Sequence, residues 1–239
     1  MTTQRIGIFD SGVGGLTVYR QVKKKTNSKV IYFGDTARAP YGSKSSEKLR
    51  KYAFQIVWFL ESLGCTQFVV ACNTLSSNVV FDRPVISLIE HGSLEALRKT
   101  KTGEIGLFAT EATVRSKAFE MHIKNLKAVA CPEFVPLIES GEISTNSIIS
   151  AIKNRLLQLG SIDTLILGCT HYPLIEDAIK TLTNAVIVDP AVPSIDKMNF
   201  EPEEAKGEDE FYVSGDPEEF EHFFEKIFGY KIKAKRHIL

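Results

Sequence analysis

The amino-acid sequence predicts an α/β protein with two similar domains, each a mainly parallel β-sheet flanked by helices, and a cleft between them. Two observations carry this prediction. Short, apolar, β-rich runs alternate with longer amphipathic stretches, as in parallel sheets covered by helices on both faces. The alternation also occurs in two successive blocks, and each block contains a strand-like run that ends in a cysteine followed by polar residues.

The expected elements follow one another in a regular order. In the first block, helices begin near Gly15 and Ser46, and strands are expected at 5–9, 30–33, 68–71 and 84–87. After Gly92, helices are expected around 116–124 and 147–159, and strands at 105–109, 127–130, 164–167 and 185–188. Residues 196–210 are polar and acidic, which is typical of a surface connection. A strand at 210–213 and a helix from Pro217 to near Gly229 complete the pattern.

Composition excludes several classes of protein. The chain has 239 residues, 44% of them hydrophobic and 24% charged, which is typical of a globular protein with a substantial core. Lys and Arg together number 29, as do Asp and Glu, so the basic surface of a nucleic-acid binder is not expected. The one basic cluster, at 231–236, fits a solvated terminus. No apolar run is long enough to span a membrane and the first residues lack a signal sequence, so a cytoplasmic location is expected.

The two strand–cysteine runs resemble each other closely. FVVACNT (68–74) contains Cys72 and LILGCTH (165–171) contains Cys169. Ligands of open α/β sheets bind beyond the carboxyl ends of the strands. Two such halves facing each other would place two thiols around one cleft, and the alternative is that two buried cysteines share a pattern by coincidence.

A glycine-rich turn, FDSGVGGLTV (9–18), follows the first strand and opens a helix. It lacks the GxGxxG spacing and the lysine of phosphate-binding loops, and the Asp10 carboxylate would repel a phosphate. Asp10 beside a helix amino terminus suits a ligand that carries both an ammonium and a carboxylate. The alternative is a tight turn that needs glycine for steric reasons, with Asp10 as a cap.

The thiols allow several chemistries. Cys72, Cys169 and His171 lack the paired spacing of zinc sites, so no metal is expected. A nucleophilic cysteine requires only one thiol. Two thiols on opposite faces of a carbon acid can remove a proton from Cα and return one from the far side. Because a free thiol is only partly ionised at neutral pH, each thiol needs a neighbouring group, and Asp10, Glu139 and His171 are candidates.

Polar residues next to each cysteine fit a small zwitterionic ligand. Asn73, Thr74 and Thr170 can donate or accept hydrogen bonds, and His171 is an acid–base group near neutral pH. Alternatively, Thr170 and His171 cap the next helix, which would have a proline in its first turn. The other two cysteines, Cys65 and Cys131, lack such neighbours and are expected to be structural.

The motifs taken together resemble those of the glutamate racemases. The matching segments are DSGVGG (10–15), GDTARAPYG (34–42), ACNT (71–74), ATVRS (112–116), CPEFVPLIE (131–139) and LGCTHYP (167–173). Their order and approximate spacing match that family over roughly residues 5 to 190. SGDPEEF (214–220) resembles the family's ending. Leu75 and His91 depart from the family's pattern, as does the region after Asp189.

This resemblance implies interconversion of L- and D-glutamate without a cofactor, which supplies D-glutamate for peptidoglycan. It implies a first domain of residues 1–91 plus 208–239, a second domain of 92–207, an active site between them and a homodimer. Cys72 and Cys169 would transfer protons, with Asp10, Glu139 and His171 as supporting acids and bases. The implied substrate contacts are Asp10, Ser11, Tyr41, Gly42, Asn73, Thr74, Thr170 and His171. Asp35, Thr110 and Thr113 lie where the family has supporting groups.

Three other functions remain open from the sequence. A racemase of aspartate or another small amino acid could use the same fold. A binding or inhibitory relative could keep the fold without the chemistry. A single-cysteine hydrolase would act on an ester or amide rather than on a free amino acid.

Overall fold

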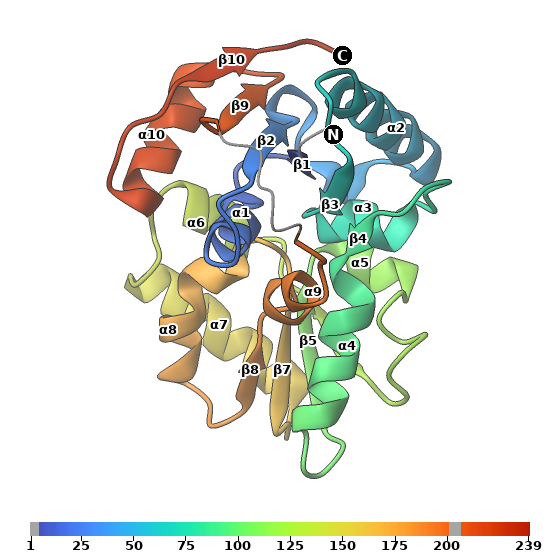
Figure 1. Ribbon diagram of the computed structural model, residues 1–239. Helices are drawn as coiled ribbons and strands as arrows, with labels where there is room; N and C mark the ends of the chain where they lie inside the picture. The colour runs from blue at the N-terminus through green and yellow to red at the C-terminus, as the bar shows by residue number, and fades with distance from the viewer. Residues whose placement is uncertain (1–4, 201–206) are drawn as a thin grey trace.

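Two parallel β-sheets, each with helices on both faces, make up the protein (Figure 1). The computed structural model describes residues 5–200 and 207–239. Within these residues the predicted fold class is confirmed, and every strand pair runs parallel.

The first sheet has six strands in the order β10-β9-β2-β1-β3-β4. They are β1 (Arg5–Asp10), β2 (Lys29–Gly34), β3 (Gln67–Val70), β4 (Ile86–Ser87), β9 (Glu210–Val213) and β10 (Ala234–Arg236). Its helices are α1 (Leu16–Lys23), α9 (Ala191–Asp196) and α10 (Pro217–Phe228) on one face, and α2 (Ser46–Ser62) and α3 (Asn73–Asn78) on the other. Short 3-10 turns, η1 (Thr36–Arg38) and η2 (Tyr41–Ser43), follow β2.

The second sheet has four strands in the order β6-β5-β7-β8. They are β5 (Ile105–Ala109), β6 (Lys127–Ala130), β7 (Thr164–Gly168) and β8 (Val186–Val188). Helices α6 (Phe134–Glu139), α7 (Asn146–Leu159) and α8 (Glu176–Lys180) pack on one face, and α4 (Leu88–Lys99) packs on the other. Two further elements follow strand ends, α5 (Glu111–Ser116) after β5 and the 3-10 turn η3 (Tyr172–Ile175) after β7.

The side-chain alternation of β1 explains how the first sheet is buried on both sides. Ile6 and Ile8 pack with α1 and α10, whereas Phe9 points to the face covered by α2. All three side chains are fully buried. Successive residues of a strand point to opposite faces, so a continuous apolar run fits a central strand of this kind.

The prediction of a helix around 116–124 is wrong. The helix lies earlier, as α5, where the side chain of Thr110 accepts a hydrogen bond from the Thr113 N–H as an amino-terminal cap. It ends because Lys117 adopts the left-handed conformation, with φ of 56°. Phe119 and Ile123 in the following turns are still buried, so their apolar spacing reflects core packing rather than a helix.

The basic tail is more ordered than a solvated terminus. Residues 234–236 form β10, which pairs with β9 at the edge of the first sheet. Lys235 Nζ lies 2.8 Å from Glu210 Oε2 and over the ring of Tyr212. The side chains of Lys231 and Lys233 remain largely exposed.

Two helices connect the sheets and pack against each other (Figure 1). α4 leaves the first sheet after β4 and covers the second, whereas α9 leaves the second sheet after β8 and packs on the first. Gly92 allows this crossing, because a Cβ there would lie 2.6 Å from Pro190 Cβ. The division at 91 and 92 falls within α4, and the domain boundaries stay a prediction. Part of the connection expected at 196–210 lies outside the described residues.

Candidate active site

A cavity of about 510 Å³ lies at the carboxyl ends of strands from both sheets. Both Cys72 and Cys169 line it. Of the residues predicted for the site, it is also lined by Ser11, Tyr41, Gly42, Asn73, Thr74, Thr110, Glu139, Thr170 and His171. Asp10, Asp35 and Thr113 lie outside the lining, and each is buried against residues that belong to it.

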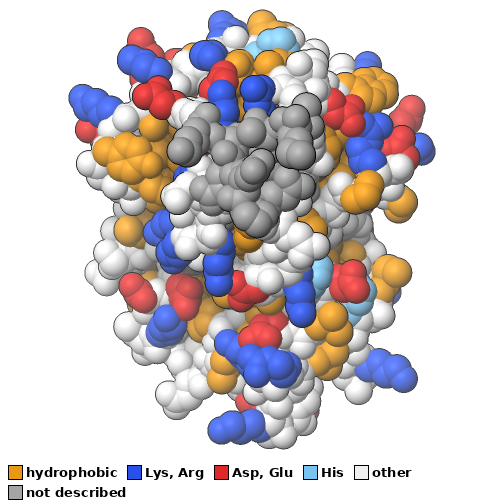
Figure 2. All heavy atoms as spheres, viewed as in Figure 1, with side chains coloured by type: hydrophobic (Ala, Val, Ile, Leu, Met, Phe, Trp, Pro, Cys, Tyr) orange, Lys and Arg blue, Asp and Glu red, His pale blue; other side chains and the backbone are white. Residues whose placement is uncertain are grey.

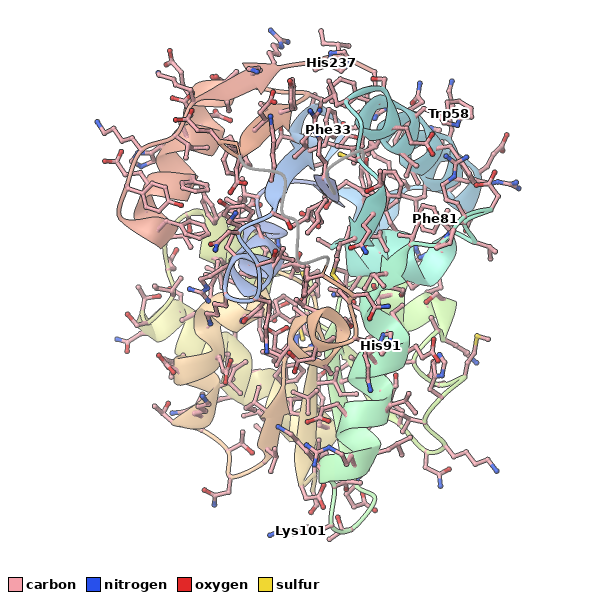
Figure 3. The ribbon with its side chains drawn as sticks, in the orientation of Figure 1. Phe33, Trp58, Phe81, His91, Lys101 and His237 are labelled. Carbon is pink, nitrogen blue, oxygen red and sulfur yellow. The ribbon has the colours of Figure 1, made fainter. Side chains whose placement is uncertain are left out.

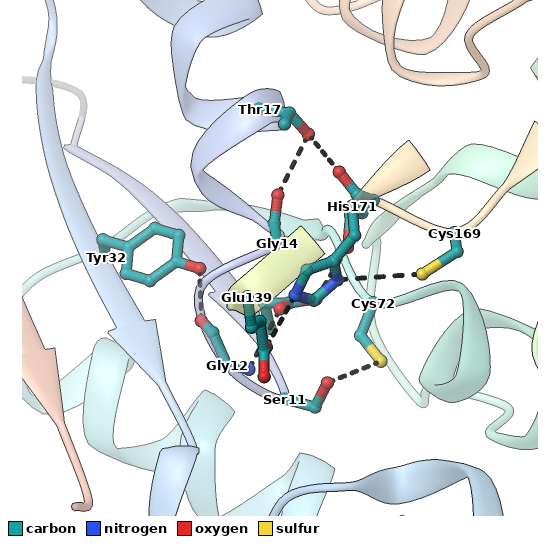
Figure 4. A network of polar contacts seen from close by, with 11 residues as sticks. Ser11, Gly12, Gly14, Thr17, Tyr32, Cys72, Glu139, Cys169 and His171 are labelled. Carbon is teal, nitrogen blue, oxygen red and sulfur yellow. Dashed lines mark hydrogen bonds and ion pairs between the residues drawn. The ribbon is translucent and has the colours of Figure 1, made fainter. Parts of the chain in front are cut away.

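Cys72 stands between β3 and α3, where it is the residue preceding the first turn of the helix. Its side chain is buried, and Sγ lies 3.6 Å from Ser11 Oγ as a donor (Figure 4). Burial, with a smaller contribution from the nearby Asp10 carboxylate, raises the pKa of this thiol to about 12. Cys72 therefore needs a proton acceptor, or a change in its surroundings, to become a thiolate.

Cys169 follows β7 in the second sheet and has a different neighbour. Its Sγ lies 3.8 Å from His171 Nδ1, and His171 Nε2 lies 2.9 Å from Glu139 Oε1 (Figure 4). Burial alone would lower the pKa of His171, but its hydrogen bonds to Cys169 and Glu139 outweigh burial and raise the pKa to about 10. The three side chains form a chain of acid–base groups that ends at one thiol.

The glycine-rich turn is held by hydrogen bonds to Asp10, which lies behind the cavity lining. Asp10 Oδ2 accepts a hydrogen bond of 3.0 Å from the Gly12 N–H, as a turn-stabilising residue does. Asp10 also accepts from Thr170 Oγ1, at 3.4 Å, across the two halves. Burial raises the pKa of this carboxyl, although His171 and backbone N–H groups oppose the rise. Gly15 must be glycine, because a Cβ would lie 2.6 Å from Asp10 Cβ.

Neutral polar side chains form much of the remaining wall. The Oγ1 atoms of Thr74 and Thr110 are 3.1 Å apart and connect α3 with α5 across the cavity, and Thr110 and Thr113 are 3.0 Å apart. Asn73 is buried, and its Oδ1 has no hydrogen-bond partner among the described residues. A buried carbonyl oxygen without a partner in a cavity wall is suited to accept from a bound ligand.

Asp35 does not line the cavity but contacts a residue that does. This fully buried carboxylate accepts hydrogen bonds from Tyr41 Oη, from Arg38 Nε at 2.6 Å and from Ser214 Oγ at 2.7 Å. Tyr41 lines the cavity, so Asp35 holds one of its walls in place.

His171 does not cap the turn that follows it. Although it stands at the amino-terminal end of η3, where Pro173 lies in the first turn, its side chain caps no backbone N–H. The ring is engaged with Cys169 and Glu139 instead.

Sequence reasoning missed several residues of the wall. They include Gly12, Ala39, Pro40, Ser43, Glu111, Cys131, Pro132, Val135 and Pro136. Those at 131–136 directly follow β6, which ends at the same sheet edge as β7, and that position was a usable signal. Cys131 is fully buried, and its Sγ points to the Val129 carbonyl oxygen at 3.6 Å.

The two single residues that depart from the family pattern lie outside the cavity. Leu75 is fully buried in the core between α2, α3 and the first sheet. His91 lies on α4 beside α9 (Figure 3). Neither side chain contributes to the cavity wall.

Residues 5–200 and 207–239 hold no group of three or more His, Cys, Asp or Glu that could bind a metal. No helix in those ranges is both long and apolar enough to cross a bilayer. Basic and acidic side chains are interspersed on the face shown in Figure 2.

Comparison with known proteins gives a consistent picture. The family model for Asp/Glu/Hydantoin racemase matches residues 6–197. A glutamate racemase from Desulforudis audaxviator is 46% identical over 212 residues, covering 82% of this chain and 78% of that protein.

Two solved structures are similar over nearly the full length. A glutamate racemase isoform from Bacillus anthracis has a TM-score of 0.91 at 31% identity, covering 100% of this chain and 99% of that one. A glutamate racemase from Francisella tularensis, solved in complex with D-glutamate, has a TM-score of 0.86 at 29% identity, covering 100% of this chain and 98% of that one. The protein described here therefore belongs to the Asp/Glu/hydantoin racemase family.

Proposed function

We propose that this protein is a glutamate racemase that interconverts L- and D-glutamate by proton transfer at Cα, with two thiols as acid and base and no cofactor. The observation that carries the proposal is the convergence of Cys72 and Cys169, from two different sheets, on one cavity. The relatives named glutamate racemase, one of them solved with D-glutamate, support the choice of substrate.

The cavity wall also suits an acidic amino acid whose Cα proton must be removed. No Lys or Arg occurs among the described residues that line it, so apart from the protonated His171 ring the carboxylates would be held by neutral donors. Ser11, Thr74 and Thr170 offer hydroxyl groups for this purpose. The Asn73 Oδ1 atom can accept a hydrogen bond from the substrate ammonium, and the Asp10 carboxylate behind the wall favours that charge electrostatically.

The reaction then needs one proton out and one proton in. With L-glutamate bound, Cys169 as a thiolate takes the Cα proton, and the Cα–H electron pair remains on the substrate as a carbanion. Cys72 as a thiol delivers its proton to the opposite face, which gives D-glutamate and leaves a thiolate at Cys72. The reverse reaction exchanges the two roles. We assign the L-enantiomer to Cys169, with His171 and Glu139 assisting, and the D-enantiomer to Cys72, with Asp10 assisting.

A hydrogen-isotope experiment tests this function. The protein is incubated with L-glutamate in heavy water without added cofactor, and both enantiomers are followed by chiral chromatography and mass spectrometry. Deuterium is expected in newly formed D-glutamate well before it accumulates in the remaining L-glutamate, because the returning proton comes from a different, solvent-equilibrated thiol. Equal early labelling of both enantiomers would indicate a single shared base.

Aspartate and alanine are assayed beside glutamate to separate the alternatives. A racemase of another small amino acid would act on one of these in preference to glutamate. A protein that only binds would show ligand-dependent stabilisation without any labelling at Cα.

Three further parts of the proposal come from the family resemblance. The D-glutamate would be used in peptidoglycan synthesis, the protein would act in the cytoplasm, and it would form a homodimer. Sedimentation equilibrium tests the dimer directly.

A further inference from the structure

The buried hydroxyl group of Thr17 joins the two cysteine-bearing halves behind the cavity. Thr17 lies on α1 of the first sheet and is 1% exposed. Its Oγ1 lies 2.8 Å from the carbonyl oxygen of Thr170, which is the residue between Cys169 and His171 in the other half. The same Oγ1 lies 3.0 Å from the carbonyl oxygen of Gly14 (Figure 4).

The geometry of this contact is tight on both sides. A Cβ at Gly14 would lie 2.3 Å from His171 Nδ1 and 2.6 Å from Thr170 Oγ1. The glycine-rich turn and the 169–171 segment are therefore in direct van der Waals contact. Thr170 Oγ1 also donates to Asp10 Oδ1, at 3.4 Å, from the same segment. The distance between these two segments is thus set by packing at Gly14 and by the Thr17 hydroxyl.

Thr17 does not line the cavity, so it has no part in binding the substrate directly. The segments that it connects carry Ser11, which contacts Cys72, and Cys169 itself. A hydroxyl has one proton, so Thr17 donates to one carbonyl oxygen at a time, and both acceptors are within its reach. A buried carbonyl oxygen that loses its donor is costly, which keeps the contact closed.

We infer that Thr17 is a positioning residue for the proposed two-thiol reaction, which fixes the spacing of the two thiols by holding the 169–171 segment against the glycine-rich turn. The inference rests on the proposed function. Proton transfer requires both sulfurs to be within reach of one Cα, so a small increase in their separation slows turnover. Substrate binding depends on the cavity wall and is affected much less.

The test compares Thr17→Val, which keeps the shape and removes the hydroxyl, with Thr17→Ser, which keeps the hydroxyl. For glutamate racemisation, kcat of Thr17→Val is expected to fall about tenfold or more in both directions with KM changed less than about threefold. Thr17→Ser is expected to retain most of the wild-type kcat. The matched control is Thr164→Val, which removes another fully buried threonine hydroxyl in β7, one that bonds Asp163 away from the cavity. Its kcat should stay near the wild-type value.

A second substitution tests the same contact by adding a methyl group to the glycine-rich turn, at Gly14. Gly14→Ala should push the 169–171 segment away and lower kcat in the same way as Thr17→Val. All variants are checked by circular dichroism and assayed well below their melting temperatures. Should Thr17→Val not fold, Thr17→Ala takes its place, because alanine favours the helix.

The outcomes separate this inference from the proposed function. If the wild-type protein does not racemise glutamate, the proposed function fails. If the wild type is active, a folded Thr17→Val or Thr17→Ala variant with wild-type kcat overturns the positioning role. The role is also overturned if Thr17→Ser is as slow as Thr17→Val, or if KM rises while kcat is unchanged.

Discussion

At the scale of single residues, the two thiols differ in what surrounds them. Cys169 has an imidazole 3.8 Å away, whereas Cys72 has the Ser11 hydroxyl and, deeper, the Asp10 carboxyl. Because burial raises the pKa of Cys72 to about 12, the Cys72 half depends on a group that can accept its proton. The symmetry of the two sequence runs therefore extends to the sulfurs but not to their partners.

The raised pKa of His171 predicts a pH-dependent contribution to stability. The pKa is 6.5 in the unfolded chain and about 10 in the folded protein, so the contribution is complete below pH 6.5 and is lost as pH rises through 10. His171→Asn should therefore have a lower free energy of unfolding than the wild type near pH 7. This deficit should be about 1–3 kcal/mol larger near pH 7 than near pH 10. Urea unfolding at both pH values measures this. A difference that is constant with pH would contradict the assignment.

Replacing Cys131, the third cysteine in the cavity lining, tests whether a thiol in the cavity takes part in the reaction merely because of its position. Cys131 lines the cavity, but its Sγ donates to the Val129 carbonyl oxygen rather than to an acid–base side chain of the proposed reaction. Cys131→Ala should therefore keep kcat within a few-fold of wild type and lose about 1–3 kcal/mol of stability through the truncated core side chain. Cys169→Ala, the comparison variant, should lose racemisation altogether. A folded Cys131→Ala protein without turnover would show that the thiols are wrongly assigned.

At the scale of elements, the sequence predicted strands better than helices. The nine expected strands are all present because each contains a short apolar run, which is a local signal. The central strands β5 and β7 are buried on both faces, whereas the edge strand β8 is only partly buried. β10 was missed because it is only three residues long, two of them basic, at an exposed sheet edge. The helix expected at 116–124 was misplaced because Phe119 and Ile123 are buried by tertiary packing, while the Thr110 cap that sets the real helix is a polar signal.

The left-handed end of α5 offers an element-scale prediction. Lys117 adopts φ of 56°, a conformation that is strained for a residue with a Cβ but free of strain for glycine. Lys117→Gly should therefore stabilise the protein by about 0.5–1 kcal/mol in chemical unfolding. Asn125, at φ of 59°, is the matched control, since asparagine tolerates this region better and Asn125→Gly should gain less. A loss of stability in Lys117→Gly would mean that contacts of the Lys117 side chain stabilise the protein by more than its backbone strain costs.

At the scale of the whole molecule, the cavity exists only because two sheets meet. The cysteines and their polar neighbours were predictable, since each follows a strand end, where α/β sheets bind ligands. Two other features were not predictable from the sequence, because they depend on residues far apart in it. These are the crossing of α4 and α9 between the sheets and the contact of Thr17 with Thr170. No local pattern encodes which strand ends will face each other.

A ligand that fills this cavity should stabilise both halves together. The binding experiment uses the Cys72→Ser variant. Because this variant is not expected to interconvert the enantiomers, the glutamate enantiomer that is added is the one that stays bound. At glutamate concentrations about a hundredfold above Kd, a ligand that binds only the folded protein adds about 2.7 kcal/mol. For a chain of this size, that corresponds to a rise in melting temperature of roughly 5–10 °C.

Both enantiomers are expected to produce this rise in a single calorimetric transition, because the residues around the ligand come from both sheets. Asn73→Ala in the same background removes the carbonyl oxygen that has no protein partner, and it should reduce the rise. Lysine, whose second ammonium would replace the side-chain carboxylate, is the negative control and should leave the melting temperature unchanged. Two separate transitions, with only one of them moved by glutamate, would show that the ligand binds within one half rather than between them.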